Sequence, residues 1–278
     1  MSTDHVADKV IIVTGASSGF GRLVAQKAAE RRAWVVAADI NEPELAATVD
    51  SIRDRGGTAQ AVFADVTDLG QMEALAAAAI EKYGRIDVMV NNAGTMPLAF
   101  HADHARAAEA WDRCIDVNIK GVLHGIMAVH DQMISQGRGH VINLSSIYGN
   151  FPVAGAGVYG ATKAAVNFLS ESLRVESQGQ IKVTTVKPTG VPATGLGAGV
   201  VNPEAIVGIL GTRAPEYLGT VRARGGGADD ELFDPENMGY LALDPELLAD
   251  QIMYAIDQPW GVSIGDITVR ASGDRFLL

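Results

Sequence analysis

Tyr159 and Lys163 stand four residues apart in the segment YGATK, and their side chains could together move a proton. The following stretch, AAVNFLSESLRVES, continues as a helix, so the two side chains share one helical face. A free tyrosine titrates near about 10, and acid–base work near neutral pH requires a pKa lower by roughly two to three units. A nearby lysine charge acts in that direction because it stabilises the phenolate. The same spacing also fits an exposed tyrosine beside a solvated lysine.

A glycine-rich turn, TGASSGFG, follows the first apolar run of the chain directly. Its glycines permit a tight turn and let the backbone approach a pyrophosphate, whose charge meets the N–H groups and positive end of the next helix. A lone turn of this kind also fits an ordinary strand–helix connection, but its place after a predicted strand near the N-terminus favours a nucleotide. The expected contacts in this turn are Gly15, Ser17, Ser18, Gly19, Phe20 and Gly21.

Asp39 ends the second apolar run, 18 residues after the last glycine of that turn. A carboxylate there can accept hydrogen bonds from both hydroxyls of an adenosine ribose, which favours NAD(H). A 2′-phosphate would be repelled by roughly 4 kcal/mol at about 4 Å and an effective dielectric constant of about 20, before screening. Ser17, Ser18 and Ile40 offer no cation to reverse this preference. Arg22 lies within the helix, where a solvated role is the simpler interpretation.

Seven short apolar runs rich in β-branched residues alternate with amphipathic or Ala-rich stretches. Near-continuous apolarity in VIIV and WVVAA indicates strands that are covered on both faces. The pattern therefore predicts an α/β fold, a Rossmann-like doubly wound parallel sheet of about seven strands with helices on both faces. Ser146 lies near the end of the fifth run, in INLSS. The strands are expected at about 10–14, 34–38, 60–63, 86–90, 139–145, 181–187 and 266–270.

One dinucleotide-binding domain over 1–278 is the economical interpretation, because no linker or repeat divides the chain before residue 190. The alternation is interrupted at about 190–245 by GLGAG, by Gly225–Gly227 and by the acidic stretch DDELFDPEN. Long segments of this kind are commonly either partly disordered surface insertions or mobile substrate lids, and both interpretations stand.

The composition narrows the range of partners. A net charge of −11 opposes binding to nucleic acid and to anionic membranes, which leaves small molecules and other protein chains. Cys114 is the single cysteine, and MSTDHVADK lacks the features of a secretory signal, so we expect a cytoplasmic protein. His101 and His104 form an HxxH pair, but no further ligand cluster accompanies them and no metal is expected.

Taken together in this order, the motifs resemble those of the short-chain dehydrogenase/reductase family of ordinary length. The resemblance covers about 8–190 and resumes at the last strand. It implies that Tyr159 exchanges a proton with the substrate oxygen, while Lys163 binds the nicotinamide ribose and lowers the tyrosine pKa. Ser146 would orient the substrate, and Asn118, in DVNIKG, would hold a water that links the lysine to a proton relay.

The resemblance also extends the expected cofactor contacts, and it weakens at one place. Where the family usually has Pro-Gly, a hydrophobic residue and a threonine, this chain reads KPTGVPAT over 187–194, so Val191 fits and Thr194 is displaced by one position. NNAG at 91–94 is expected to stabilise the central sheet. The added cofactor contacts are Asp65, Val66, Asn92, Ala93, Gly94, Tyr159, Lys163, Pro188, Gly190 and Val191.

A hydrophobic or aromatic alcohol or ketone is the expected substrate, because the side chains near these motifs are mostly apolar. The alternative is that these side chains pack in the core, as most apolar side chains of a domain do. The expected pocket wall comprises Met96, Leu98, Phe100, Tyr148, Phe151, Val153, Leu196 and Val200. The resemblance further implies a homodimer or homotetramer through helices around 106–133 and 157–178.

Three functions are compatible with these patterns. The first is an NAD(H)-dependent oxidoreductase that interconverts a secondary alcohol and a ketone. The second is a sugar-nucleotide epimerase or dehydratase, for which 278 residues leave little room for a separate substrate domain. The third is a non-catalytic dinucleotide sensor, which could keep Asp39 and the glycines but would not need the four filled catalytic positions.

Overall fold

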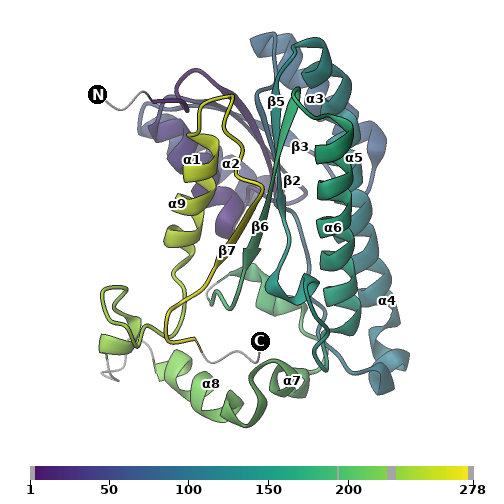
Figure 1. Cartoon of the computed structure of the whole chain (residues 1–278), viewed down its shortest axis with the longest axis vertical. Coiled ribbons are helices and arrows are strands. Elements are labelled where there is room, and N and C mark those ends of the chain that lie inside the picture. The colour runs from purple at the N-terminus through teal and green to yellow at the C-terminus, as the bar shows by residue number, and fades with distance from the viewer. Residues whose placement is uncertain (1–3, 193, 224–229, 275–278) are drawn as a thin grey trace.

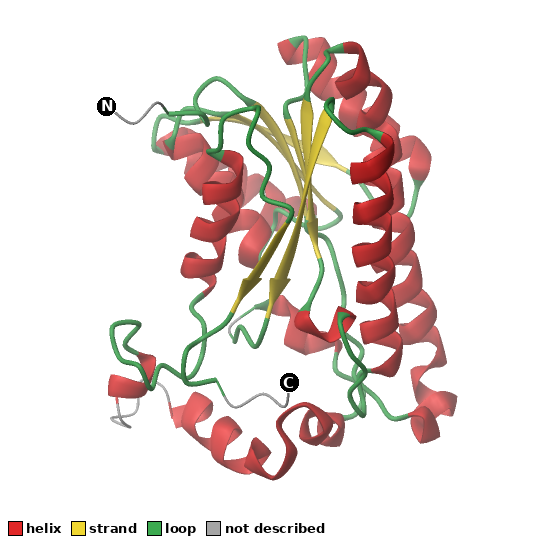
Figure 2. Ribbon diagram, in the orientation of Figure 1, coloured by secondary structure: helices red, strands yellow, loops and turns green. Residues whose placement is uncertain are grey.

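The apolar runs of the sequence form one parallel sheet at the centre of the computed structural model, which describes residues 4–192, 194–223 and 230–274 (Figure 1). The order β3-β2-β1-β4-β5-β6-β7 confirms the predicted seven-stranded, doubly wound topology (Figure 2). Its strands are β1 (Val10–Thr14), β2 (Trp34–Asp39), β3 (Thr58–Phe63), β4 (Val88–Asn91), β5 (Gly139–Leu144), β6 (Ile181–Pro188) and β7 (Asp266–Val269).

Helices cover both faces of the sheet, as the unbroken apolarity of the central strands requires. In β1, Ile11 and Val13 pack into one hydrophobic cluster, whereas Val10 and Ile12 pack into the other. The first layer contains α1 (Gly19–Glu30), α2 (Glu42–Asp54) and α9 (Pro245–Ile256). The opposite layer contains α3 (Leu69–Tyr83), α4 (His104–Ile115), α5 (Gly121–Ser135) and α6 (Gly157–Glu176) (Figure 1).

Helices α4 and α5 are joined by a π-helical turn, Asp116–Lys120, which contains Asn118. No helix in the described part of the chain is both long and apolar enough to cross a membrane.

The insertion after β6 carries helices of its own, which its glycine and acidic content did not reveal. A 3₁₀ segment (Gly195–Gly199), α7 (Ile206–Leu210) and α8 (Ala214–Ala223) lie beyond the carboxyl ends of the strands (Figure 1). A third hydrophobic cluster joins Ile209, Leu210 and Tyr217 of this insertion to Tyr148 and Tyr159. The Gly225–Gly227 run lies outside the described residues, as does the start of the acidic stretch.

Candidate active site

Three positions of the glycine-rich turn have either a backbone conformation or a close neighbour that disfavours a side chain. Gly15 and Gly19 have φ angles of +66° and +51°, a region that disfavours any residue with a Cβ. A Cβ on Gly21 would lie 2.2 Å from the carbonyl oxygen of Gly15, so α1 can pack against the turn because this position is glycine. The Asn92 amide donates to the carbonyl oxygens of Thr14 and Gly15, at 2.9 and 3.2 Å, and fixes the turn to the end of β4.

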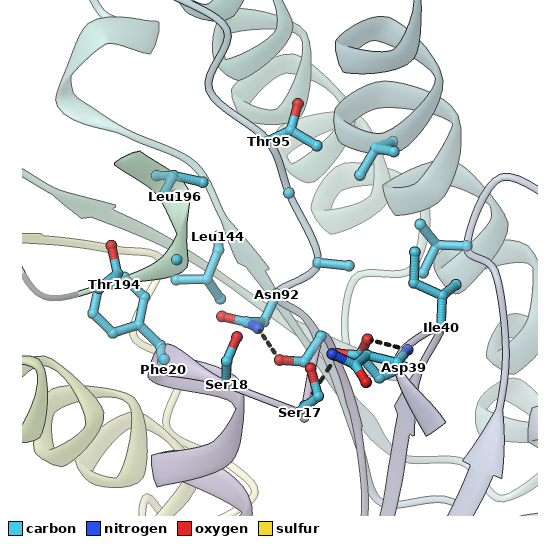
Figure 3. Close-up of a pocket in the computed structure, with 18 of the residues that line it drawn as sticks. Ser17, Ser18, Phe20, Asp39, Ile40, Asn92, Thr95, Leu144, Thr194 and Leu196 are labelled. Carbon is cyan, nitrogen blue, oxygen red and sulfur yellow. Dashed lines mark hydrogen bonds between the residues drawn. The ribbon is translucent and has the colours of Figure 1, made fainter. Parts of the chain in front are cut away.

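Asp39 at the end of β2 faces the same turn (Figure 3). Its two carboxylate oxygens accept hydrogen bonds from the backbone N–H groups of Ser17, at 3.0 Å, and Asn41, at 2.9 Å. Arg22 donates to the Ser17 carbonyl oxygen and pairs with Glu44 at 2.7 Å. The arginine is thus held by protein partners, a more definite role than the solvated one inferred from sequence.

A cleft of about 400 Å³ runs from Asp39 along the carboxyl ends of the strands to Tyr159 and Lys163. It is lined by most of the predicted cofactor contacts: Gly15, Ser17, Ser18, Gly19, Phe20, Asp39, Ile40, Asp65, Val66, Asn92, Ala93, Gly94, Tyr159, Lys163 and Pro188. Three predicted contacts do not line it. Gly21 is buried beneath the turn, whereas Gly190 and Val191 line a second, apolar cavity. Thr194, displaced in the sequence pattern, lines both spaces.

Asn91 of the NNAG motif links the central strands β4 and β5, and the same hydrogen-bonded chain continues to α6, which the sequence did not predict. The Asn91 amide donates to Asn143 of β5 at 2.8 Å, and the Asn143 amide donates to the Ser170 hydroxyl at 2.9 Å. These buried polar groups hold β4, β5 and α6 together directly behind the residues that line the cleft.

Ser146, Tyr159 and Lys163 come together where β5 ends and α6 begins. The Lys163 ammonium donates to the Leu144 carbonyl oxygen at 2.7 Å and lies 5.8 Å from the centre of the Tyr159 ring. The Ser145 hydroxyl donates to the Lys163 carbonyl oxygen at 3.0 Å, which fixes α6 to the strand end. Tyr159 and Lys163 are almost completely buried, so their protonation states depend on their few neighbours.

Burial controls the electrostatics of this group. It raises the pKa of Tyr159 to about 12, and the hydrogen bond with Ser146 acts in the opposite direction. It lowers the pKa of Lys163 to about 8, while the neighbouring Cys114 acts to raise it. The sequence-based expectation of a lowered tyrosine pKa is therefore wrong for the protein alone, because desolvation of the phenolate outweighs the hydrogen bond with Ser146.

Asn118 is buried beside this group and its side chain is fully engaged with protein atoms. Its amide nitrogen donates to the Thr95 carbonyl oxygen and the Thr162 hydroxyl, each at 3.0 Å, and its amide oxygen accepts from the Thr95 N–H at 2.9 Å. The Thr162 hydroxyl in turn donates to the Tyr159 carbonyl oxygen at 2.7 Å. Asn118 therefore connects the loop after β4 to the N-terminal part of α6, and its role in holding a water stays a prediction.

A second cavity, of about 470 Å³ and mostly apolar, meets the cleft at Tyr159. Of the predicted pocket wall, Met96, Leu98, Tyr148, Leu196 and Val200 line this cavity. The prediction was wrong for Phe100, Phe151 and Val153, which pack against the third hydrophobic cluster instead. Apolar side chains in a loop near a site can either line a cavity or pack into the core, and the sequence carried no signal to separate these two roles.

The sequence did not single out several residues that line these spaces. Arg113 lines the cleft one helical turn before Val117 and, with Lys163, places positive charge there. Its position five residues before Asn118 was a usable signal, since α4 must run along the cleft to bring Asn118 into place. The apolar cavity adds Pro203, Ile206, Ile209, Leu210 and Tyr217 to the expected wall, and it is also lined by Phe20, which was predicted as a cofactor contact.

Comparison with known proteins decides the family. The family model described as short chain dehydrogenase matches residues 9–204. The chain belongs to this family. It is 34% identical to an uncharacterized oxidoreductase of Listeria monocytogenes over 267 residues, which span 95% of this chain and 96% of the relative. It is 32% identical to one of Staphylococcus epidermidis over 266 residues, which span 95% and 98%.

Solved structures of related proteins carry both kinds of nicotinamide cofactor. A short-chain dehydrogenase/reductase from Burkholderia phymatum in complex with NAD is 29% identical, with a TM-score of 0.75 over 96% of this chain and 90% of that chain. A metagenomic short-chain oxidoreductase in complex with NADP is 28% identical, with a TM-score of 0.72 over 96% and 98%. This short-chain dehydrogenase is thus an oxidoreductase with the family's NAD(P)-binding fold.

Proposed function

We propose that this short-chain dehydrogenase interconverts a secondary alcohol and a ketone with NAD(H), acts on a hydrophobic or aromatic substrate, and uses Tyr159 as its general acid and base. The observation that carries this proposal is the meeting of the dinucleotide cleft and the apolar cavity at Tyr159. A substrate in the cavity would reach the Tyr159 hydroxyl from one side and a cofactor in the cleft from the other.

The residues of the cleft fit a dinucleotide. Gly15 and Gly19 take positive φ angles that shape the turn, and Gly21 lets α1 pack closely beneath it, so the turn can bring its backbone close to a pyrophosphate. Asp39 stands where a ribose diol would be recognised, and Ile40 and Val66 provide apolar surface on the same wall. Bound nicotinamide supplies or accepts the hydride and, in its oxidised form, brings a positive charge that favours the phenolate.

The protein's own groups account for the proton. In the reducing direction, the Tyr159 hydroxyl donates its proton to the substrate oxygen, and Ser146 holds the same oxygen through its hydroxyl. Lys163, with a pKa of about 8, is charged at neutral pH and supports the phenolate that remains. In the oxidising direction, the phenolate removes the proton from the alcohol.

Preference for NAD(H) rests on Asp39 and Arg22. The carboxylate of Asp39 would repel a 2′-phosphate, and Arg22 is already held by Glu44 and the Ser17 carbonyl oxygen. An arginine held in this way is poorly placed to turn towards a phosphate on the ribose. These contacts support NAD(H) over NADP(H).

The test combines cofactor titration with turnover. NADH and NADPH are titrated against protein fluorescence, and turnover is measured on a panel of aliphatic and aromatic ketones and secondary alcohols. We expect NADH to bind at least about tenfold more tightly than NADPH, and aromatic ketones to be reduced. Tyr159→Phe keeps the ring and removes the proton, so we expect turnover to fall by about 10²- to 10⁴-fold while the variant still binds NADH.

Two results would contradict the proposal. Near-normal turnover by Tyr159→Phe would remove its acid–base role. Tight NADH binding without turnover of any alcohol or ketone would instead favour a dinucleotide sensor.

A further inference from the structure

Tyr148 lines the apolar cavity and carries a hydroxyl that the function proposed above does not use. The residue lies in a 3₁₀ turn, Ile147–Gly149, two positions after Ser146. Its side chain lines the cavity and is 6% exposed. Its hydroxyl is buried and has no hydrogen-bond partner among the described residues. Buried polar groups without partners are rare in native proteins, and each needs a physical explanation.

The position of Tyr148 relative to the catalytic tyrosine is fixed by the backbone. Its N–H donates to the Ser146 hydroxyl oxygen at 3.2 Å. On α6, a Cβ at Gly160 would lie 2.8 Å from the Tyr148 carbonyl oxygen, so this turn packs directly on the residue that follows Tyr159. Tyr148 and Tyr159 are therefore presented to one cavity from two segments in close contact.

The charged groups near Tyr148 in the described part of the chain form no hydrogen bond with its hydroxyl. Asp274 is the nearby acid, and its carboxylate already accepts from the Thr189 hydroxyl at 3.1 Å and from Arg270 at 2.6 and 3.1 Å. Burial raises the pKa of Tyr148 far above its ordinary value, and Tyr159 and Asp274 act in the same direction. The phenol therefore stays protonated and is available as a hydrogen-bond donor.

We propose that the Tyr148 hydroxyl donates a hydrogen bond to a second oxygen of the substrate. This inference rests on the proposed alcohol–ketone function and narrows its substrate class. The substrate is then an apolar ketone or secondary alcohol with another oxygen close to the reacting carbon, as in 1,2-diketones and α-hydroxyketones. A cavity built around such a donor discriminates against analogues that lack the acceptor, because the donor is then left buried and unpaired.

The experiment uses a matched pair of ketones and the variant Tyr148→Phe. The ketones are 1-phenyl-1,2-propanedione and phenylacetone, which share a reducible carbonyl next to a methyl group and differ by the neighbouring carbonyl. For wild type and variant we divide kcat/KM for the dione by kcat/KM for phenylacetone. The intrinsic reactivities of the two ketones cancel when this ratio is compared between the two proteins. We expect Tyr148→Phe to lower the ratio by about tenfold, the factor that one hydrogen bond contributes.

Tyr217→Phe is the matched control, since Tyr217 also lines the cavity and is also buried. We expect it to change kcat/KM for both ketones by the same factor. A thermal unfolding measurement separates recognition from a structural role: Tyr148→Phe should keep the wild-type Tm or raise it, because it removes an unpaired hydroxyl.

The possible outcomes separate this inference from the function on which it depends. If both ketones are reduced and Tyr148→Phe leaves their ratio unchanged, the inference is wrong and the proposed function stands. The assignment is also wrong if the ratio responds to Tyr217→Phe instead, or if Tyr148→Phe lowers the Tm by several degrees. If wild type reduces neither ketone nor any member of the broader panel, the proposed function fails and the inference with it.

Discussion

At the scale of single residues, the site places a charged group where it is almost completely shielded from solvent. Lys163 is buried, and its pKa falls from 10.5 to about 8. Folding therefore has to desolvate the ammonium at neutral pH, which costs roughly 3 kcal/mol for a displacement of this size. Under the proposed function, a charge beside the Tyr159 phenol would serve proton transfer, which gives a reason for keeping this unfavourable group.

The cost of burying Lys163 can be measured through its dependence on pH. Between about pH 8 and about pH 10.5 the unfolded chain carries the lysine proton and the folded protein does not, so wild-type stability rises with pH in this window. Lys163→Met has no proton to lose. We expect the variant to be more stable than wild type near about pH 7, and its advantage to shrink by up to roughly 3 kcal/mol as the pH rises through the window.

Urea unfolding of both proteins at several pH values measures this difference directly. Lys9, whose pKa burial also lowers to about 8, is present in both proteins and cancels. A stability difference that does not change with pH would show that Lys163 is not desolvated as the structure indicates.

Asp39 allows a second test at this scale. We expect Asp39→Asn to raise the affinity for NADPH relative to NADH by at least about tenfold, because it removes the charge that would repel a 2′-phosphate and keeps the shape of the side chain. Asp65→Asn is the control, since it removes the same charge from another part of the cleft. Fluorescence titration gives both affinities. An equal increase in NADPH affinity relative to NADH affinity in the two variants would contradict a specific role for Asp39.

At the scale of elements, the packing of α1 against the glycine-rich turn leaves less room for a Cβ than the glycine positions that line the cleft. A Cβ on Gly21 would lie 2.2 Å from the Gly15 carbonyl oxygen and 2.6 Å from the Asn92 amide nitrogen. We expect Gly21→Ala to move the turn, to destabilise the fold by about 1–3 kcal/mol and to weaken NADH binding at least about tenfold. Gly261→Ala is the control, because a Cβ at that position would meet no described atom within 4 Å. Wild-type Tm and NADH affinity in Gly21→Ala would disprove this account.

The elements also show how far the sequence determines the site. The strands were predictable because runs such as β1 are apolar almost throughout, and the predicted catalytic residues follow at strand and helix ends with fixed spacing. The part of the cavity wall formed by Ile209 and Tyr217 was not predictable, because these residues lie on short helices whose packing depends on distant segments. The direction of the Tyr159 pKa was also missed, since desolvation depends on burial that spacing alone does not reveal.

At the scale of the whole molecule, the outer face of the α5–α6 layer carries exposed apolar side chains. Leu123 and Met127 are four residues apart on α5, and Phe168 and Val175 are seven apart on α6, so each pair follows one helical face. The two helices belong to the same layer (Figure 1). We propose that this face forms a symmetric interface between two copies of the chain, in keeping with the resemblance that first suggested an oligomer.

Phe168 tests that interface because it is 78% exposed, an unusual cost for so large an apolar side chain in a monomer. Phe168→Glu would place two carboxylates near each other across a two-fold axis, so we expect the protein to shift towards monomer. Its Tm should fall only by the amount that loss of subunit association accounts for. Light scattering after size-exclusion chromatography measures the mass. Tyr254→Glu on α9, 56% exposed in the opposite layer, should leave the mass unchanged. A monomeric wild type would disprove the interface, and an oligomer broken by Tyr254→Glu alone would place it on the opposite layer.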